Sequence, residues 1–454
     1  MRFKFLNQNM EQRRELILRG NLLPTLLMLS VPALMMGVVQ SLIPVIDGLF
    51  LNNLAGTNAA SAVTYCTPIV NMTSALSQGL SVAGMAIIGQ SNGRGDFKGS
   101  RRITVQLVVF AFILGFILAP LLVGLAFPIS GHVDSEISHN VFLYLSLNAL
   151  VIPFSFLESI YNAIKNASGK PEDSFIRMII MLILKILFNT LFVAVFSMGL
   201  IGSVMASLAS NILITFWMFY ELFMKKNGDR LEFKGFHFDK EIIKQLLYIG
   251  FPSMLSSLML NLGFFLINNE VEKYGAIVLN GQGIANNITS VCFILPSSFG
   301  SAVTTMVSMN VGAGQSKRAK YSCLVGCITS AITAIILIAV IVPLSSHLTV
   351  LFTREQDVLS IADRALHIYT YSVVGFGICM VEQGAFIGLG KTKVTLVISV
   401  LRVWLLRYLF ILATEHSLSY YSVFWGNLFS NYMAAFLITL LILKVKWRSN
   451  LHLA

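Results

Sequence analysis

The strongest constraint on this fold is a series of apolar segments that recurs along the whole chain. Each has about 20 residues or more, the length that an α-helix needs to cross a hydrocarbon core of about 30 Å. No stretch is left over for a soluble domain, so we predict an all-α integral membrane protein. Its twelve transmembrane helices are expected near residues 24–51, 61–89, 103–127, 141–164, 175–197, 200–224, 246–268, 279–307, 322–345, 363–389, 394–414 and 420–443.

The charges are few and unevenly placed. Only 12% of the residues are charged, whereas soluble proteins carry about a quarter. Lysine and arginine gather in both terminal tails and in every second loop, while the alternate loops carry only Lys273, Arg354 and Arg364. This pattern predicts a multi-pass protein of the cell (inner or plasma) membrane with both termini cytoplasmic. The net charge of +11 therefore indicates topology and contact with anionic membrane lipids, not a nucleic-acid partner.

The two halves of the chain repeat each other at an offset of about 220 residues. Residues 89–101 read GQSNGRGDFKGSR, and residues 308–320 read SMNVGAGQSKRAK, with two glycines in register. Further pairs follow in the same order: Pro32 with Pro252, Gly169–Lys170 with Gly390–Lys391, and Ser210–Asn211 with Ser430–Asn431. The order of these matches at a near-constant offset indicates a duplication.

Each half carries six spans, so both halves enter the membrane in the same orientation. Parallel repeats of this kind are related by an axis along the membrane normal, with the substrate site at their interface. We therefore expect two six-helix lobes, related by a parallel pseudo-two-fold, at residues 1–224 and 245–454. The polar stretch 225–244 is expected to be a cytoplasmic linker.

A twelve-span chain with an internal repeat is typical of a secondary transporter. The chain has no GxxxxGK[ST] phosphate loop and no segment of the size of a nucleotide-binding domain, so ATP cannot drive it directly. The seven histidines lie in loops or near span ends, so no catalytic set emerges and we expect no enzyme activity. We also expect no cofactor and no metal site, because the five cysteines lack metal-binding spacing.

Several stretches resemble the multidrug and toxic compound extrusion (MATE) family. VGAGQSKRAK is similar to the GAGDYERAR-like loops of that family, and the resemblance continues through AIKNASGKPEDS, SMGLIGSVMAS and FIGLGKTKVTLVISVLRVWLLR. It covers the whole chain and is closest to the bacterial DNA-damage-inducible protein F branch. DFKGSRR at residues 96–102 matches the GxxxDRxGRR loop of the major facilitator superfamily only in part. That superfamily is the fold-level runner-up.

Six ionisable residues lie within the predicted spans: Asp47, Glu158, Lys185, Glu382, Arg402 and Arg407. An ionised side chain near the bilayer centre costs about 2.5–3.5 kcal/mol, so each should face a cavity or pair with another. Arg402 and Arg407 are five residues apart and should point in different directions on an α-helix. We therefore expect no shared basic patch, and expect Arg402 to bond to neighbouring backbone rather than to substrate.

Estimated depths place the ionisable residues of the first half in two tiers. At about 1.5 Å per residue, Asp47, Asn189 and Ser207 can share one level above the midplane. Lys185 lies one turn below Asn189 on the same helix face, and Glu158 falls near the level of Lys185. Asp47 is then a cavity carboxylate or an aspartate that merely reaches interfacial water. Glu158 is a functional acid or a structural partner of Lys185.

The MATE resemblance implies ion coupling in the first half, through an Asp on span one, an Asn and an Asp four apart on span five, and a Thr on span six. Asp47 matches the first, and Ser207 stands at the last. On span five the four-apart pair is Lys185 and Asn189, so the chain departs from the family at both positions. A lysine is a poor neighbour for sodium, which favours protons as the coupling ion, although sodium stays open.

The resemblance also implies a bending helix. Pro32 matches the span-one proline that is linked to bending in this family, and Pro44 adds a second break just below Asp47. We expect both prolines to act as hinges.

The expected substrate cavity combines Asp47 and Glu158 with residues of the second half: Glu382, Asn261, Gln282 and Asn286. For Glu382 the alternative is a role in helix packing. For the three amides the alternative is hydrogen bonding between helices.

These features together predict a secondary active multidrug efflux antiporter. It would export amphiphilic, mainly cationic organic compounds in exchange for protons, as a monomer. The alternatives are a major facilitator-type transporter and a lipid-linked oligosaccharide flippase of the MATE superfamily. The small number of basic residues at mid-membrane counts against the flippase, whose cavity must meet a pyrophosphate.

Overall fold

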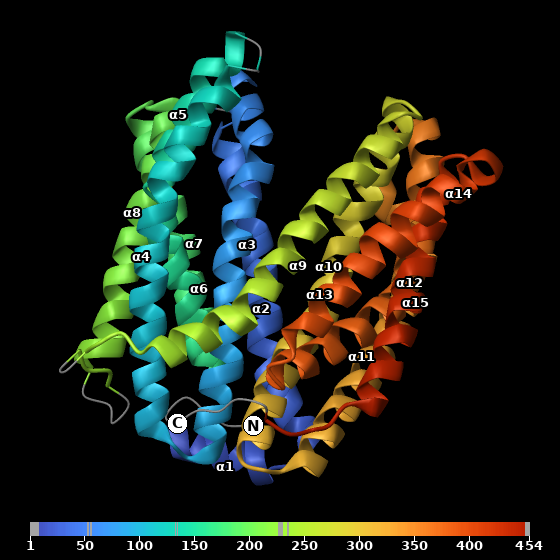
Figure 1. The fold of residues 1–454 in the computed structure, drawn as a ribbon. Helices are drawn as coiled ribbons and strands as arrows, with labels where there is room; N and C mark the ends of the chain where they lie inside the picture. Colours follow the sequence, from blue (N-terminus) through green and yellow to red (C-terminus); the bar gives the residue numbers. More distant parts are fainter. Residues whose placement is uncertain are drawn as a thin grey trace. The chain divides into compact units, whose positions relative to one another are not determined.

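The chain folds into helices and short connections (Figure 1). The computed structural model describes residues 9–51, 54, 57–131, 133, 135–225, 230–233 and 236–449. Within those ranges, 11 helices are long and apolar enough to cross a membrane. The bent pair Ile137–Ala149 and Ile152–Ala167, with 50° between its members, supplies the twelfth span when the pair is counted as one. The predicted all-α fold with twelve spans is confirmed.

The helices group into two compact units. The first unit takes the described residues up to Arg14 and those from Met35 to Met254. It contains the first half of α1 (Met10–Arg19), the second part of α2 (Leu22–Phe50), α3 (Thr57–Arg94), α4 (Phe97–Ser130), α5 (Ser135–Ala149) and α6 (Ile152–Ala167). It continues with α7 (Pro171–Asn189) and the π-helical turn η2 (Thr190–Val195), α8 (Gly199–Phe219) and η3 (Tyr220–Met224), and the first part of α9 (Lys240–Glu272).

The second unit takes Glu15–Leu34 and the described residues from Leu255 onward. It contains the second part of α9 (Lys240–Glu272), α10 (Ala276–Gly312), α11 (Ser316–Val350), α12 (Gln356–Gly388), α13 (Thr392–Val400), the π-helical segment η4 (Leu401–Tyr408), α14 (Leu409–Leu418) and α15 (Tyr421–Lys444). The lobe boundaries expected from the sequence place the linker at 225–244 and stay a prediction.

Besides a boundary inside α1, after Arg14, two unit boundaries lie inside long helices, at positions that the repeat relates. In α2 the change of unit comes after Leu34, two residues beyond Pro32. In α9 it comes after Met254, two residues beyond Pro252. Proline has no backbone N–H and therefore removes one hydrogen bond of a helix ladder. Each boundary thus follows a point where its helix is weakened.

The repeat is also visible in the loops. Gly95 and Gly314 have φ values of 80° and 75°, and Gly169 and Gly390 have φ values of 70° and 74°. Only glycine enters this left-handed region without steric cost, which explains why both halves keep it at these helix ends.

The N-terminal segment, expected to be a tail, contains the short helix α1. Arg13 is buried and forms an ion pair with Glu172, and the Arg14 guanidinium donates to the carbonyl of Gly93 at 2.9 and 3.0 Å. Burial lowers the pKa of Arg13, while the carboxylates of Glu172 and Asp173 oppose that shift. Two basic residues of the topology signal therefore also anchor this helix.

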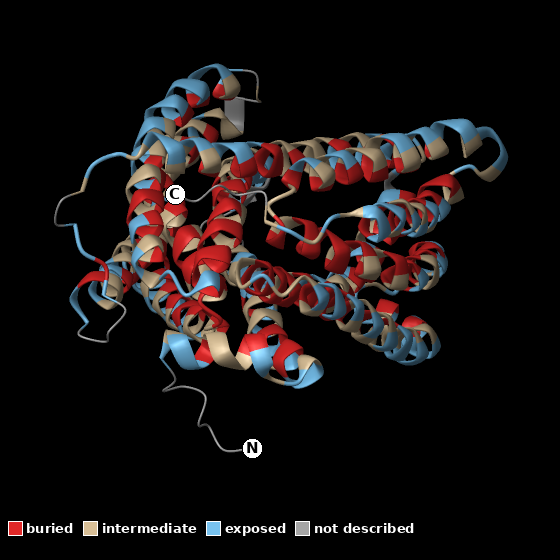
Figure 2. Ribbon diagram, turned by 60° about the horizontal axis from the view of Figure 1, so that its bottom comes forward, coloured by how far each residue is buried: buried red, intermediate tan, exposed pale blue. Residues whose placement is uncertain are grey.

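The helices differ in how much of their apolar surface is buried. Only 17% of the most apolar stretch of α11 is buried, against 61% in α10 and in α12. Exposed residues run along the outer faces of the helices, and buried residues lie where helices meet (Figure 2). In a bilayer the large exposed side chains of α11, such as Ile328, Ile335 and Val340, face lipid. Hydropathy follows this difference: its mean is 2.7 for α11 against 1.5 for α10 and 1.3 for α12, so the most apolar of these spans is the least buried.

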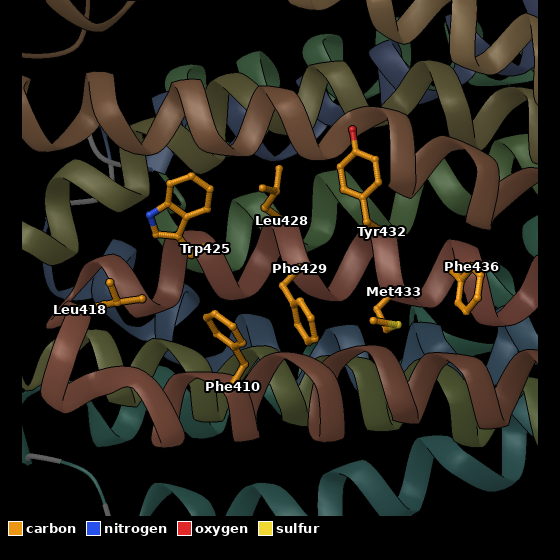
Figure 3. A pocket seen from close by; sticks show the side chains of 8 residues that line it. All are labelled: Phe410, Leu418, Trp425, Leu428, Phe429, Tyr432, Met433 and Phe436. Atoms are coloured by element: carbon orange, nitrogen blue, oxygen red, sulfur yellow. The ribbon is translucent and has the colours of Figure 1, made fainter.

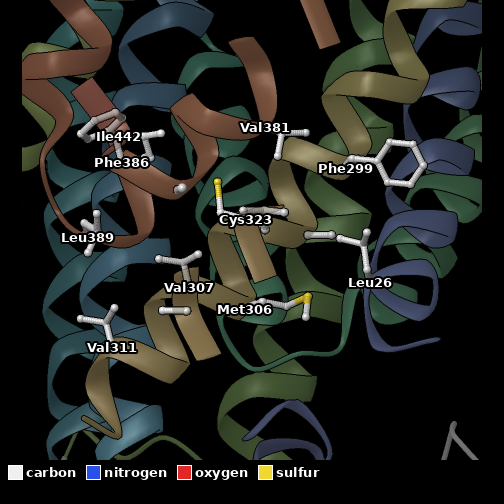
Figure 4. Close-up of a cluster of buried hydrophobic side chains, with 14 of the residues drawn as sticks. Leu26, Phe299, Met306, Val307, Val311, Cys323, Val381, Phe386, Leu389 and Ile442 are labelled. Carbon is white, nitrogen blue, oxygen red and sulfur yellow. The ribbon is translucent and has the colours of Figure 1, made fainter. Parts of the chain in front are cut away.

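The core of the second unit forms around α10 and α12 (Figure 4). Met306, Val307 and Phe386 are buried there, and Leu26 of α2 joins them. The two helices approach so closely that a Cβ atom built on Gly384 would lie 2.2 Å from the carbonyl oxygen of Gly300. Thr304 donates to the carbonyl of Gly384 at 3.0 Å and holds this contact. Small residues at such a crossing are what helix association in membranes requires.

We predict that Gly384→Ala destabilises the protein, because the added methyl group meets a backbone oxygen that cannot rotate away. Overpacking of this kind costs about 1–3 kcal/mol. The measurement is the apparent melting temperature of the purified protein in detergent. Gly283→Ala in α10 is the matched control, since a Cβ atom there has no neighbour within 4 Å. The control should melt at the same temperature or higher, because alanine favours helix. Equal melting temperatures for the two variants would contradict the close packing.

Candidate functional site

One face of α7 carries the polar residues of the candidate site. Arg177, Met181, Lys185 and Asn189 follow each other at intervals of four residues, which places them along one side of a helix. All four side chains are buried. A stripe that contains two cations and an amide is unusual for a membrane helix and must be matched by partners on neighbouring helices.

Asp47 is the partner of the outer part of this stripe. Its Oδ2 atom forms an ion pair and hydrogen bond with the ammonium group of Lys185. Its Oδ1 atom accepts a hydrogen bond from the side-chain amide of Asn189 at 2.8 Å. The Lys185 side chain is 7% exposed, whereas Asp47 is 22% exposed. The carboxylate therefore joins a buried cation to a more open space.

That space is a pocket of about 280 Å3 inside the first unit. Asp47 and Pro44 of α2 line it, together with side chains of α3, α5 and α8. Its lining includes the polar residues Thr67, Asn71, Tyr144, Asn148, Ser203 and Ser207. The predicted grouping of Asp47, Asn189 and Ser207 is realised in part: Asn189 bonds to Asp47, while Ser207 lines the same pocket and donates to the carbonyl of Ser203 at 3.1 Å.

The lower tier differs from the expectation. Glu158 forms its ion pair with Arg177, at 3.1 Å between Oε1 and Nη1, while Lys185 pairs with Asp47. The predicted Glu158–Lys185 pair is therefore wrong for this structure. The physical reason is that α7 offers two cations, two turns apart, so each carboxylate takes the one nearer its own level. Arg177, which the charge pattern assigned to topology, is 1% exposed, and its spacing of eight residues, or two helical turns, from Lys185 was the signal that could have identified it.

The candidate residues of the second unit differ in burial and in hydrogen-bond partners. Glu382 is buried, and the hydroxyl of Thr439 on α15 lies 3.0 and 2.9 Å from its two carboxylate oxygens. Gln282 is also buried, while Asn286 is exposed on α10. Asn261 is partly buried and donates to the carbonyl of Ser257 at 3.1 Å, within its own helix. Their expected role in a substrate cavity stays a prediction.

The side chains of Arg402 and Arg407 leave their helix in more similar directions than expected. The segment that carries them, η4, is a π-helix, in which hydrogen bonds join residues five apart. Residues at that spacing therefore lie on nearly the same face, whereas the expectation assumed an α-helix. Both arginines are buried.

A second hollow, with no charged side chain among its lining residues, lies along α14 and α15 (Figure 3). Its volume is about 680 Å3, and aromatic rings dominate it. Phe410 and Phe429 stack with their centroids 5.0 Å apart, and the hydroxyl of Tyr432 donates to the carbonyl of Tyr371 at 3.0 Å. It offers apolar surface without a group that could bind an ion.

Within the described part of the chain, no group of three or more His, Cys, Asp or Glu side chains could hold a metal ion. The chemistry of the Asp47 site is therefore best considered as that of a carboxylate, an ammonium group and an amide.

Comparison with known proteins gives this arrangement a family. The model of the MatE family matches residues 32–191 and again residues 252–412, so the two matches begin 220 residues apart, at Pro32 and Pro252. The duplication inferred from the sequence agrees with this double match. The match also excludes the major facilitator alternative.

Curated relatives match over most of the chain. The probable multidrug resistance protein YoeA of Bacillus subtilis is 25% identical, covering 91% of this chain and 90% of its own. The multidrug export protein MepA of Staphylococcus aureus is 20% identical, covering 90% and 92%. The human multidrug and toxin extrusion protein 1 is 23% identical over 83% of this chain and 66% of its own.

Solved structures agree with the fold. A MATE protein in its bent conformation has a TM-score of 0.89 at 21% identity, covering 94% of this chain and 96% of its own. An outward-facing multidrug resistance MATE transporter of the MOP superfamily has a TM-score of 0.86 at the same identity and coverage. The branch suggested by the motifs stays a prediction. With its two family matches, its twelve spans and a fold shared with solved MATE proteins, the chain belongs to the MatE family of membrane transporters.

Proposed function

We propose that the chain is a secondary active multidrug efflux antiporter that exports amphiphilic, mainly cationic organic compounds in exchange for protons. The observation that carries this proposal is Asp47, a partly exposed carboxylate in a pocket of a membrane-spanning unit, bonded to Lys185 and Asn189. The names of the relatives, multidrug resistance and multidrug export proteins, support the substrate class.

In the arrangement observed, the charges of Asp47 and Lys185 cancel. Protonation of Asp47 removes the negative charge and leaves the buried ammonium group with the neutral amide of Asn189. Breaking a buried ion pair by loss of one partner costs about 3–5 kcal/mol, and less here because Asp47 is partly exposed. The pocket then carries one positive charge instead of none.

This change of charge makes protons and cationic compounds compete. A cation in the pocket meets a neutral ion pair in one state and an uncompensated ammonium group in the other. It is therefore bound more weakly when Asp47 is protonated, which is the mutual exclusion that exchange requires. Coupling free energies between two ligands are typically about 1–3 kcal/mol.

The same geometry supports protons over sodium. A sodium ion needs several oxygen ligands around it, and here a fixed ammonium group occupies the carboxylate. Bringing sodium to Asp47 would place two cations next to each other in a low-dielectric site, where like charges repel strongly.

The helix that carries Asp47 supports a role for bending. Pro44 lines the pocket one turn before the carboxylate, and Pro32 lies two residues before the change of unit. We propose that both act as hinges, so that a change in the bonds of Asp47 alters the path of α2. Glu158, with its partner Arg177, would hold α6 against α7 while α2 moves.

In each unit, exposed polar residues at membrane depth support a surface that faces water. Asn71 and Gln78 of α3 are exposed, as are Asn286, Ser290 and Ser297 of α10. Such side chains avoid lipid and face a cavity or another helix. We propose that Asn286 lines the substrate route with Asn261, and that Gln282 and Glu382 support it from the interior. The protein would act as a monomer in the cell membrane with both termini cytoplasmic.

We predict that Asp47→Asn abolishes proton-coupled efflux, because the amide can neither take up nor release a proton. The measurement is efflux of ethidium from liposomes that contain the purified protein, under an imposed pH gradient. Asp357→Asn is the matched control, since Asp357 is exposed in the first turn of α12. The control should transport like the unaltered protein, while Asp47→Asn should fall to the protein-free background. Size-exclusion profiles establish that both variants are folded. Full efflux by Asp47→Asn would contradict the mechanism.

We also predict that a sodium gradient at fixed pH drives no efflux, and that Lys185→Met changes this. Removal of the ammonium group frees the oxygens of Asp47 for a metal ion, so the variant should gain sodium-driven efflux at least about tenfold above background, a difference of about 1.4 kcal/mol. Sodium-driven efflux by the unaltered protein would show that the lysine does not exclude sodium. The potassium gradient is the control for a general salt effect.

A further inference from the structure

Two arginines lie in the middle of a membrane span without acidic partners. Arg402 is 6% exposed and Arg407 is 8% exposed, and both belong to η4, between α13 and α14 of the span Thr392–Leu418. Neither arginine forms an ion pair with a carboxylate in any of the ranges that the structure describes. This sets the second unit apart from the first, where Arg177 and Lys185 each have an acidic partner.

The π-helix brings the two guanidinium groups into one region. Its hydrogen bonds join residues five apart, so Arg402 and Arg407 lie on nearly the same face. The groups lie close enough that Arg402 acts electrostatically on Arg407. Gly263 of α9 packs directly against η4, next to Val403 and Trp404, and fixes the segment from that side.

The immediate neighbours of the two groups are neutral. The Arg402 guanidinium lies 5.3 Å from the ring centre of Phe376 and beside the thiol of Cys379. The Arg407 guanidinium lies 5.8 Å from the ring centre of Phe264 and beside the hydroxyl of Tyr369. Arg402 Nη1 and Arg407 Nε are buried without a hydrogen-bond partner.

A purely structural role does not explain this arrangement. An arginine that ties helices together satisfies its donors with carbonyl or carboxylate oxygens, and here two buried donors stay unused. Two adjacent cations at mid-membrane also repel each other and lack the counter-charge that such residues normally have. An anionic group bound beside the two guanidiniums would supply both the missing counter-charge and the missing hydrogen-bond acceptors.

The aromatic rings show what the rest of the ligand would contact. Phe264 is 42% exposed and Phe376 is partly buried, so both rings next to the guanidinium groups have accessible surface. A ligand with an apolar body could pack on these rings while its anionic group reaches the arginines.

We infer that Arg402 and Arg407 form a binding site for the anionic group of an amphiphilic ligand, a carboxylate, sulfonate or phosphate. Guanidinium groups suit this role because their planar N–H donors match such oxygens in pairs. The ligand is either a soluble organic anion or an anionic phospholipid, and the shared chemistry is the anionic group beside an apolar body. The site is independent of the proton coupling at Asp47 and goes beyond the proposed function.

Equilibrium binding tests this inference without transport. The full-length protein is placed in nanodiscs of phosphatidylcholine, and the probes are fluorescein and rhodamine 123, which share one aromatic scaffold but carry opposite charge. Binding is followed by fluorescence anisotropy. Fluorescein should bind, and Arg402→Gln or Arg407→Gln should each weaken it at least about tenfold, the value of one lost charge-assisted hydrogen bond. Arg402→Lys should recover part of the affinity, since it keeps the charge.

Arg354→Gln is the matched control, because it removes one exposed arginine of the same unit. It should leave fluorescein binding unchanged, and rhodamine 123 binding should not fall in the two glutamine variants.

A second arm identifies the source of the anionic group. Nanodiscs doped with phosphatidylglycerol are compared with the phosphatidylcholine discs, and native mass spectrometry measures which lipid stays bound. Retention of phosphatidylglycerol that depends on both arginines, with loss of fluorescein binding, supports the site with a lipid as its ligand. Unchanged fluorescein binding in these discs supports a soluble anion.

The unaltered protein alone can overturn the inference, even if a variant fails to fold. The inference is wrong if that protein prefers neither fluorescein over rhodamine 123 nor phosphatidylglycerol over phosphatidylcholine. It is equally wrong if both glutamine variants are folded and keep full affinity for the anion.

Discussion

The cost of an unpaired charge in lipid governs this molecule more than any other term. An ionised group at mid-membrane is tolerated only beside a partner or in a water-filled space. In the first unit this requirement selects the contacts directly: Lys185 takes Asp47, Arg177 takes Glu158, and Asn189 completes the bonds of the one carboxylate that also faces a pocket. Stability and coupling then depend on the same bonds, because the proton that would drive exchange must break an ion pair that holds α2 to α7.

The second unit surrounds its buried charged groups with different partners. Of its buried carboxylates, Glu382 is bonded by a neutral hydroxyl and Glu270 pairs with Lys273, while its buried cations, Arg402 and Arg407, have aromatic and neutral neighbours. The two halves of the duplication have therefore kept the backbone plan and exchanged the charges.

The sequence predicted the spans, the repeat and the Asp47–Asn189 contact, because all three follow from hydrophobic length, spacing and helical rise. It did not predict which carboxylate Lys185 would choose, since a flexible lysine reaches partners above and below its own level. The shared face of Arg402 and Arg407 was missed for another reason. A π-helix changes the angle between residues, and a pattern read at 3.6 residues per turn cannot detect it. The inner helices were missed as well, although the lower hydropathy of α12, 1.3 against 2.7 for α11, carries that information.

The repeat itself explains why coupling should belong to one half. Pro32 and Pro252 occupy matching positions, and each precedes the point where its helix passes from one unit to the other. At the offset of 220 that separates the two family matches, however, Asp47 corresponds to Ile267, which is fully packed in the core of the second unit. The proline is thus present twice, while a carboxylate at the position of Asp47 is present once; the buried carboxylate of α9, Glu270, lies one turn further along and pairs with Lys273. We propose that a proton acts on the bonds of α2 through Asp47. Both α2 and α9 belong partly to one unit and partly to the other. A change confined to α2 is therefore enough to give the two states of the transporter different free energies.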